Sequence, residues 1–234
     1  MKVRQTGISV GMLPTGPKNC ITDVAGIMVG HVTLDFPLDD AGNEYVCTGV
    51  TAVIPHKGNV FKQKVAAASY VLNGFGKTTG LVQVNELGQL ESPIMLTNTF
   101  AVPAVTQGTL EYMLAENPEI GDTTGTINIV VGECNDGYLN SIRKFPVKSD
   151  HAIEAIRNAS DQKAEEGAVG AGKGMICFGY KGGIGTSSRS IEEYTIGCLV
   201  LSNFGKKEEH QKFRYSKVEG LSDTSDGSII IVLA

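Results

Sequence analysis

The chain has 234 residues, of which 41% are hydrophobic and 19% charged, and it carries a formal net charge of −5. That length suits one large or two small domains with a buried core, and the composition is that of a soluble globular protein. Lysines and arginines are scattered, so the sequence argues against nucleic acid or an anionic membrane as a partner.

The chain start and the cysteines point to the same compartment. The first seven residues lack the apolar core of a signal peptide, and no later stretch is long enough to span a membrane. The five cysteines are odd in number, widely spaced and without a CxxC pair, which is typical of reduced thiols. We therefore expect a cytoplasmic protein.

The first half of the sequence predicts a mixture of strands and one clear helix. Residues 27–33 and 50–54 are β-rich and bounded by Gly or Pro, and an acidic loop lies between them. An alanine-rich run over 64–72 fits either a helix or a buried strand. Further strands are expected at 81–84 and 94–97, and an apolar stripe predicts a helix over 102–114.

The second half continues with strands and a second helix. Residues 127–131 form a β-branched run, and Ser149 or Asp150 suits the N-cap of a helix that buries Ala152, Ile156 and Ala159. Further strands are expected at 175–180, 195–202 and 229–233, with a polar surface excursion over 205–226. Because strands outnumber helices, we expect an α+β layered fold in a single domain, 1–234, instead of a doubly wound one.

Two glycine-rich segments suggest anion binding but do not establish it. The segment 167–174 fits GxxxxGK, yet Gly174 stands where a phosphate loop needs Ser or Thr, and a polar segment precedes it where a strand is required. We therefore do not predict a nucleotide site. The segment 182–189 fits an anion-binding backbone or a hairpin turn equally well. The four histidines form no metal-ligand spacing, and we expect neither a metal nor another cofactor.

Polar residues at the ends of three predicted strands are the candidate site. Glu133 and Tyr138 follow the strand 127–131, and Asn203 follows the strand 195–202, where its amide could donate to an oxyanion. Such residues also dominate ordinary turns. Gly227 and Ser228 open the last apolar run; a serine released there by cleavage could use its own α-amine as base, although a turn entering a strand explains the pair as well.

Taken together, the ordered motifs resemble the DmpA-type aminopeptidases, the L-aminopeptidase/D-esterase-amidase group that includes the β-peptidyl aminopeptidases. The resemblance covers nearly the whole chain, in the stretches 19–31, 48–55, 72–80, 93–99, 132–138, 179–189, 203–205 and 227–228. It implies an αββα sandwich, in which two packed sheets are flanked by helices.

The resemblance also implies a function and roles for individual residues. The precursor would cleave itself between Gly227 and Ser228, dividing an α-subunit-like segment 1–227 from the first strand, 228–234, of a β-subunit-like segment. Ser228 would be the nucleophile, Asn203 an oxyanion donor, Tyr138 a stabiliser of the tetrahedral state and Glu133 a partner of the substrate amine. The expected substrates are short peptides or amino-acid amides or esters, and the expected assembly is a homo-oligomer, a tetramer of processed heterodimers.

One departure from the family leaves alternatives open. Family members continue past the nucleophile with a segment that supplies a further serine and an acidic residue. We therefore expect this sequence to be truncated or to have a separate partner segment. The rival readings are an acyl transferase resembling ornithine acetyltransferase, whose nucleophile is threonine, and an inactive truncated homologue with a binding or structural role.

Overall fold

The computed structural model describes residues 6–209 and 227–234. The described helices are α1 (Leu81–Leu87), α2 (Val102–Glu116) and α3 (Ser149–Arg157). The described strands are β1 (Met28–Pro37), β2 (Tyr45–Ile54), β3 (Val65–Ala66), β4 (Gln89–Leu90), β5 (Ile94–Asn98), β6 (Val130–Cys134), β7 (Ile176–Cys177), β8 (Tyr180–Lys181), β9 (Gly183–Ile191), β10 (Tyr194–Asn203) and β11 (Ser228–Leu233).

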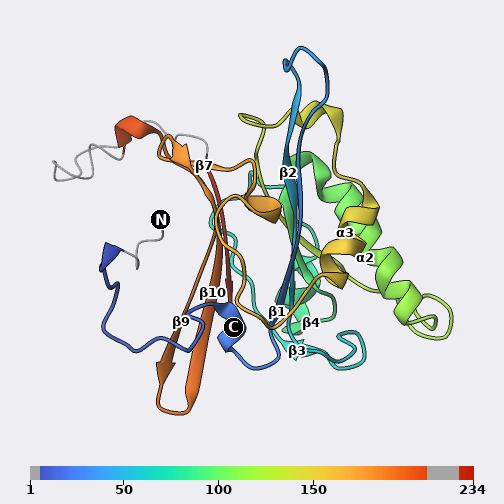
Figure 1. Ribbon diagram of the computed structural model, residues 1–234. Helices are drawn as coiled ribbons and strands as arrows, with labels where there is room; N and C mark the ends of the chain where they lie inside the picture. The colour runs from blue at the N-terminus through green and yellow to red at the C-terminus, as the bar shows by residue number, and fades with distance from the viewer. Residues whose placement is uncertain (1–5, 210–226) are drawn as a thin grey trace.

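The first sheet has the strand order β1-β2-β5-β6, and Figure 1 shows β1 and β2 side by side. β1 and β2 form a long antiparallel hairpin, paired from Met28 with Ile54 to Pro37 with Tyr45. β5 and β6 run parallel, with α2 in the connection between them, so their carboxyl ends meet at the same edge. β2 is buried on both faces for most of its length, as expected for a β-branched central strand.

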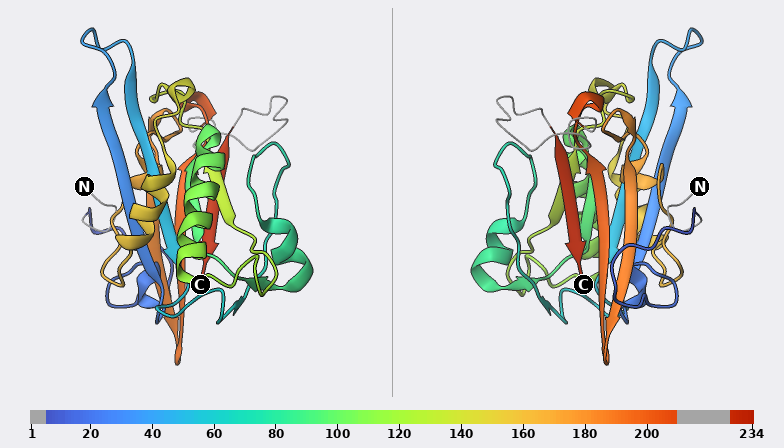
Figure 2. Two further views of the ribbon diagram at one scale, coloured as in Figure 1. Left: turned by 90° about the vertical axis from the view of Figure 1, so that its right-hand side faces the viewer. Right: turned by 90° about the vertical axis from the view of Figure 1, so that its left-hand side faces the viewer.

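Helices α2 and α3 pack on one face of this sheet (Figures 1 and 2). Their core joins Val105 and Met113 of α2 and Ile156 of α3 to the buried side chains of β2 and β5. The two helices approach closely at Gly108, where an added Cβ would lie 2.7 Å from the carbonyl carbon of Ser149. The predicted helix over 102–114 is confirmed. A second helix is also present where expected, but its N-cap is Lys148 instead of Ser149 or Asp150, and it ends at Arg157, before the half-buried Ala159.

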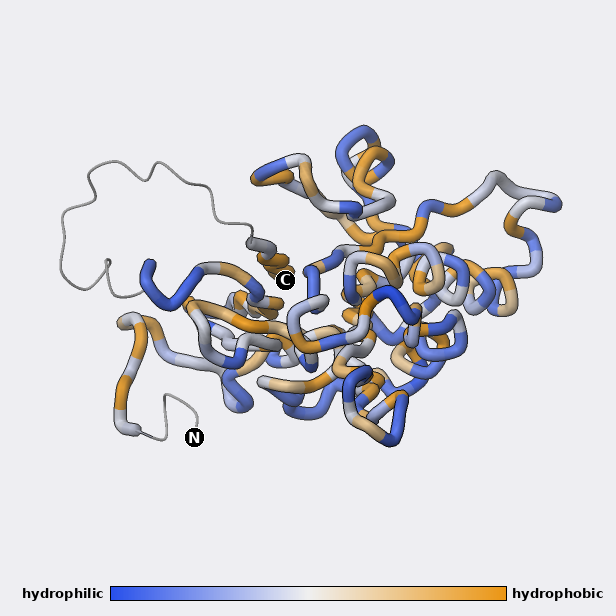
Figure 3. Tube along the Cα trace, turned by 90° about the horizontal axis from the view of Figure 1, so that it is seen from above, coloured by the Kyte–Doolittle hydropathy of each residue, from blue (hydrophilic) through white to orange (hydrophobic). Residues whose placement is uncertain are grey.

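A second sheet, ordered β11-β10-β9, packs on the other face of the first. Leu199 and Leu201 of β10 and Val232 of β11 point into the core between the sheets. The opposite face is apolar and exposed, and no helix among residues 6–209 and 227–234 covers it. In the view of Figure 3, the chain beside the C-terminus is hydrophobic. Three of the four expected layers are thus present, and the α+β class is confirmed.

Several local expectations are corrected by the structure. The strand predicted at 81–84 is wrong: these residues begin helix α1, which is bracketed by Gly80 and Gly88 at φ of 84° and 64°. The strand predicted at 175–180 is two short strands, β7 and β8, because Phe178 and Gly179 turn the chain with positive φ.

The segments left ambiguous by the sequence are also resolved. Within 64–72 only the short strand β3 is regular, and β6 begins at Val130, later than expected. The glycine stretch 182–189 is neither an anion nest nor a turn, since it lies mostly in strand β9, paired with β10. Most of the excursion over 205–226 lies outside the described residues.

Candidate active site

Ser228 is the first residue of β11 and lies opposite Asn203, the last residue of β10. Along β11, Ser228, Ile230 and Val232 are more buried than the residues between them, so this set faces the first sheet. Ile230 lies against β6, 3.4 Å from the position that a Cβ on Gly132 would take. The Ser228 hydroxyl therefore faces the region where β6 ends.

Asn203 is fixed in orientation by two backbone groups. Its Nδ2 donates to the carbonyl of Asn135 at 2.7 Å, and its Oδ1 accepts from the N–H of Ile176 at 3.0 Å. An amide nitrogen carries two hydrogens, so one remains for a further acceptor beside Ser228. The same contacts join the end of β10 to the residue that follows β6.

Gly227 occupies a position where no side chain fits. An added Cβ would lie 2.7 Å from Cβ of Phe204. Phe204 is held in turn by Phe178, whose ring meets it edge-to-face at 5.2 Å and whose N–H donates to the Phe204 carbonyl at 2.9 Å. The Gly227–Ser228 peptide bond therefore lies close to the fixed side chain of Phe204. This explains why residue 227 is a glycine.

Glu133 is a buried carboxylate on the other face of β6. Gly132 and Cys134 point toward the second sheet, so alternation places Glu133 on the side of the helices. Its Oε1 accepts from the N–H of Lys77 at 3.0 Å, and its Oε2 accepts from the hydroxyl of Thr99. The Lys77 ammonium points elsewhere. It lies over the Phe75 ring, 3.9 Å from the ring centroid, and donates to the Phe75 carbonyl.

The charge of Glu133 thus has no cationic partner among residues 6–209 and 227–234. Only 5% of the residue is exposed. Burying a carboxylate is costly unless a cation or several donors compensate for the lost water. A small ligand with an ammonium group would supply the missing charge.

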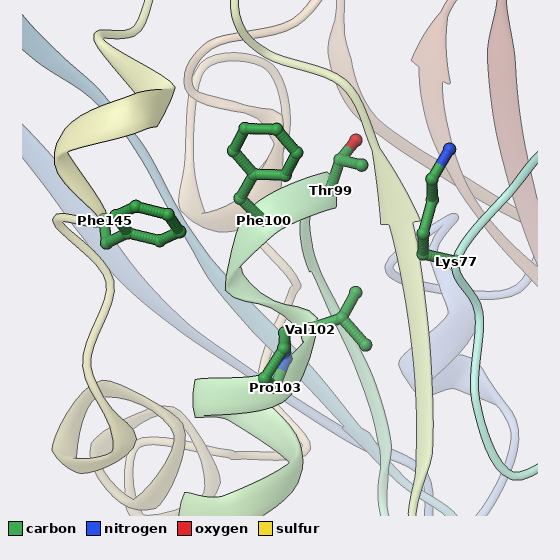
Figure 4. Close-up of a pocket in the computed structure, with 6 residues that line it drawn as sticks. All are labelled: Lys77, Thr99, Phe100, Val102, Pro103 and Phe145. Atoms are coloured by element: carbon green, nitrogen blue, oxygen red, sulfur yellow. The ribbon is translucent and has the colours of Figure 1, made fainter.

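A cavity of about 410 Å³ lies beside the two residues that donate hydrogen bonds to this carboxylate (Figure 4). Thr99 and Lys77, the two residues that hold Glu133, are part of its wall, together with Phe100, Val102, Pro103 and Phe145. Phe100 and Phe145 stack on each other with ring centroids 5.9 Å apart. The cavity is therefore mostly apolar, and two residues of its wall, Lys77 and Thr99, also donate to Glu133.

Tyr138 is placed differently from Ser228, Asn203 and Glu133. It lies in the turn after β6 and exposes 81% of its surface. Among the described residues, no hydrogen bond or ring contact joins it to Ser228 or Asn203. Its role in stabilising a tetrahedral state stays a prediction.

The sequence analysis missed a buried polar cluster beneath the turn that carries Asn135. Asp136 is 1% exposed, and Asn140 Nδ2 donates to its Oδ1 at 3.0 Å. Burial raises the pKa of the Asp136 carboxyl from 3.8 to about 6, although nearby donors, first among them Thr48, favour the charged form. Its Oδ2 is buried without a well-formed hydrogen bond. The available signal was its position inside the motif 132–138.

Residues 6–209 and 227–234 contain neither a membrane-spanning helix nor a cluster of metal ligands. No helix there is both long and apolar enough to cross a bilayer. No group of three or more His, Cys, Asp or Glu side chains there is arranged to hold a metal ion.

Comparisons with known proteins agree with this geometry. The model of Peptidase family S58 matches residues 19–234. β-Peptidyl aminopeptidase BapA of Sphingosinicella microcystinivorans is 39% identical over 213 residues, which are 88% of this chain and 52% of that protein. The chain therefore spans about half the length of this curated relative.

Solved structures extend the similarity to the whole fold. The PH0078 protein of Pyrococcus horikoshii OT3 is 46% identical with a TM-score of 0.87, covering 100% of this chain and 67% of that one. The L-aminopeptidase D-Ala-esterase/amidase of Ochrobactrum anthropi, described as a prototype serine aminopeptidase with a variant of the Ntn hydrolase fold, is 33% identical with a TM-score of 0.82, covering 98% and 66%.

Proposed function

Because this chain belongs to Peptidase family S58, we propose that it is a serine aminopeptidase of the N-terminal-nucleophile type, activated by cleavage between Gly227 and Ser228. BapA and the Ochrobactrum anthropi protein are aminopeptidases by name, and the fold is that of an N-terminal-nucleophile hydrolase. The observation that carries the proposal is Ser228 at the head of β11, the edge strand of the second sheet, facing the end of β6 and paired with Asn203.

Self-cleavage would begin with attack by the Ser228 hydroxyl on the carbonyl carbon of Gly227. The peptide C–N bond breaks as the acyl group moves from nitrogen to oxygen, and the hydroxyl proton passes to the released amine. Water then hydrolyses the ester and leaves a carboxylate on Gly227 and a free α-amine on Ser228. The tight fit of Gly227 against Phe204 holds the attacked carbonyl in place.

After cleavage, the α-amine of Ser228 would be the general base. Its ordinary pKa of about 8 keeps a useful fraction neutral near physiological pH, so that it can accept the hydroxyl proton. The hydroxyl then attacks the substrate carbonyl, the leaving amine takes the proton, and water hydrolyses the acyl-enzyme. A second N–H of Asn203 directed at the oxyanion would contribute about 3 kcal/mol to transition-state stabilisation.

Glu133 would restrict the enzyme to substrates with a free N-terminal amine, which is what defines an aminopeptidase. A free N-terminal ammonium would pair with the buried carboxylate that Lys77 and Thr99 hold and that no described cation neutralises. A substrate with a blocked amine lacks that charge and would leave the carboxylate unpaired. We therefore propose short peptides and amino-acid amides or esters with a free amine as substrates.

Intact-mass measurement tests the cleavage step. We expect the wild-type protein to break after Gly227 with time, and the Ser228→Ala variant to stay whole. Gly227→Val should slow the break, because its side chain has to displace Phe204. An unbroken wild-type chain that also leaves aminoacyl p-nitroanilides intact would support the non-catalytic reading and defeat the proposal.

The acyl-transferase reading predicts a different fate for the acyl-enzyme. Adding an amine acceptor to the processed protein would divert the acyl group from water, and mass spectrometry of the products measures that partition. We favour water as the acceptor, since BapA and the Ochrobactrum anthropi protein are named as aminopeptidases.

We also propose the processed form and its setting. Cleavage would separate a segment 1–227 from one that begins at Ser228, and the processed protein would assemble as a homo-oligomer in the cytoplasm. Light scattering on the purified protein before and after cleavage measures the assembly. Denaturing electrophoresis of the same samples reports the two segments.

A further inference from the structure

We propose that the cavity beside Glu133 binds the side chain of the substrate's N-terminal residue and selects apolar, preferentially aromatic, residues there. This inference rests on the proposed function and names its substrate class. The cavity lies between residues 99–103, which lead from β5 into α2, and residues 77 and 145, which are far from them in the sequence (Figure 4).

The first argument is adjacency. An α-amino acid carries its ammonium and its side chain on the same carbon, and a β-amino acid carries them on the same or adjacent carbons, so a site for one lies within a few ångströms of a site for the other. Thr99 and Lys77 line the cavity and donate to the two oxygens of Glu133. A residue whose ammonium pairs with Glu133 therefore has its side chain at the mouth of this cavity.

The second argument is the chemistry of the walls. Phe100, Val102, Pro103 and Phe145 contribute apolar surface, and the Lys77 ammonium is directed to Phe75. A charged side chain would lose water in this cavity without finding a partner. An aromatic ring would instead bury its area and find the Phe100–Phe145 pair to pack against.

The third argument is the backbone of Phe145. It adopts φ 50° and ψ 52°, a left-handed conformation that is rare for a bulky residue, as the C-cap of the short 3-10 helix Ile142–Lys144, where its N–H donates to the carbonyl of Ile142. The residue is still 56% exposed, so this cap leaves the Phe145 ring at the surface instead of in the core. Held there, the ring stacks on Phe100 and closes one side of the cavity.

Binding of two amino-acid amides tests the selectivity without requiring turnover. L-Phenylalaninamide and glycinamide would be titrated calorimetrically into the full chain carrying Ser228→Ala. We expect phenylalaninamide to bind about tenfold more tightly, from burial of one benzyl group. Adding Phe145→Ala should remove most of that preference, Phe145→Leu should restore part of it, and Tyr194→Ala, an exposed aromatic on β10, should leave it unchanged.

The outcomes separate this inference from the proposed function. Equal binding of the two amides, no binding of either, or a preference that survives Phe100→Ala combined with Phe145→Ala would overturn the inference. Circular dichroism of each variant confirms that it is folded. If the preference follows Phe145 but the wild-type protein hydrolyses neither phenylalanine nor glycine p-nitroanilide, the cavity assignment stands and the aminopeptidase proposal fails.

Discussion

Replacing Asp136 by Asn should make folding stability less dependent on pH. The buried carboxyl has a pKa of about 6 in the folded protein, against 3.8 ordinarily. Between those values the native chain holds a proton that the unfolded chain has lost, so the free energy of unfolding falls as pH rises through this window. Asparagine has no proton to lose, so this contribution is absent from the variant.

The size of the effect follows from the two pKa values. A gap from 3.8 to about 6 corresponds to about 3 kcal/mol, at 1.36 kcal/mol for each pH unit. Asn140 is expected to stay beside the new amide, because asparagine has the shape of aspartate and keeps one acceptor oxygen. The stability of Asp136→Asn relative to wild type should therefore improve by about 3 kcal/mol between about pH 4 and pH 7.

Urea unfolding of both proteins at several pH values across this range measures the difference. Asp40→Asn is the matched control, since the same chemical change is made on an exposed residue of the β1–β2 loop and should give a nearly constant difference. Parallel stability curves for wild type and Asp136→Asn would refute the reasoning, because they would mean that burial does not raise the pKa of this carboxyl.

Three further predictions concern packing, thiol reactivity and substrate recognition. Gly108→Ala should destabilise the protein by about 1–3 kcal/mol, although alanine has the better helix propensity, because the new methyl group meets the backbone of Ser149. Gly125→Ala, where the new methyl group meets open space, is the control and should be neutral or slightly stabilising. Thermal unfolding compares the two variants, and a stabilised Gly108→Ala would contradict the close contact between the helices. Cys134 is 0% exposed, and this burial raises the pKa of its thiol. Iodoacetamide should therefore modify the half-buried Cys177 before Cys134 in the native protein, which peptide mass mapping measures. Early labelling of Cys134 would argue against this packing. Glu133→Gln should lower kcat/KM for free aminoacyl anilides by about tenfold or more and leave any cleavage of N-acetylated ones unchanged; an equal loss on both would point to a structural role.

Local sequence patterns were sufficient for most elements of the fold. The β-branched runs became β2, β5 and β10, and the apolar stripe with Pro103 near its start became α2. Helix α1 was missed because Leu81–Val84 is a short, mostly apolar run with two valines, and such a run fits a strand as well as a helix. Its two flanking glycines, both in the left-handed conformation, end the extended backbone on either side.

The candidate site was only partly readable for a different reason. Ser228, Asn203 and Glu133 each stand at one end of an apolar run, and the sequence alone shows that position. The cavity is not, because its walls come from residues 77, 99–103 and 145, which no spacing rule connects. Asp136 shows the same limit, since its importance comes from burial against neighbours far away in the chain.

The ladder between β10 and β11 has a mechanical consequence for a chain cut before residue 228. Six residue pairs, from Asn203 with Ser228 to Cys198 with Leu233, clamp the new amino end to its neighbour, and Gly197 and Ala234 extend the clamp by two hydrogen bonds. Breaking the covalent link would therefore leave β11 paired with β10. The cut would appear in an intact mass taken under denaturing conditions, while Ser228 would keep its place opposite Asn203 in the native protein.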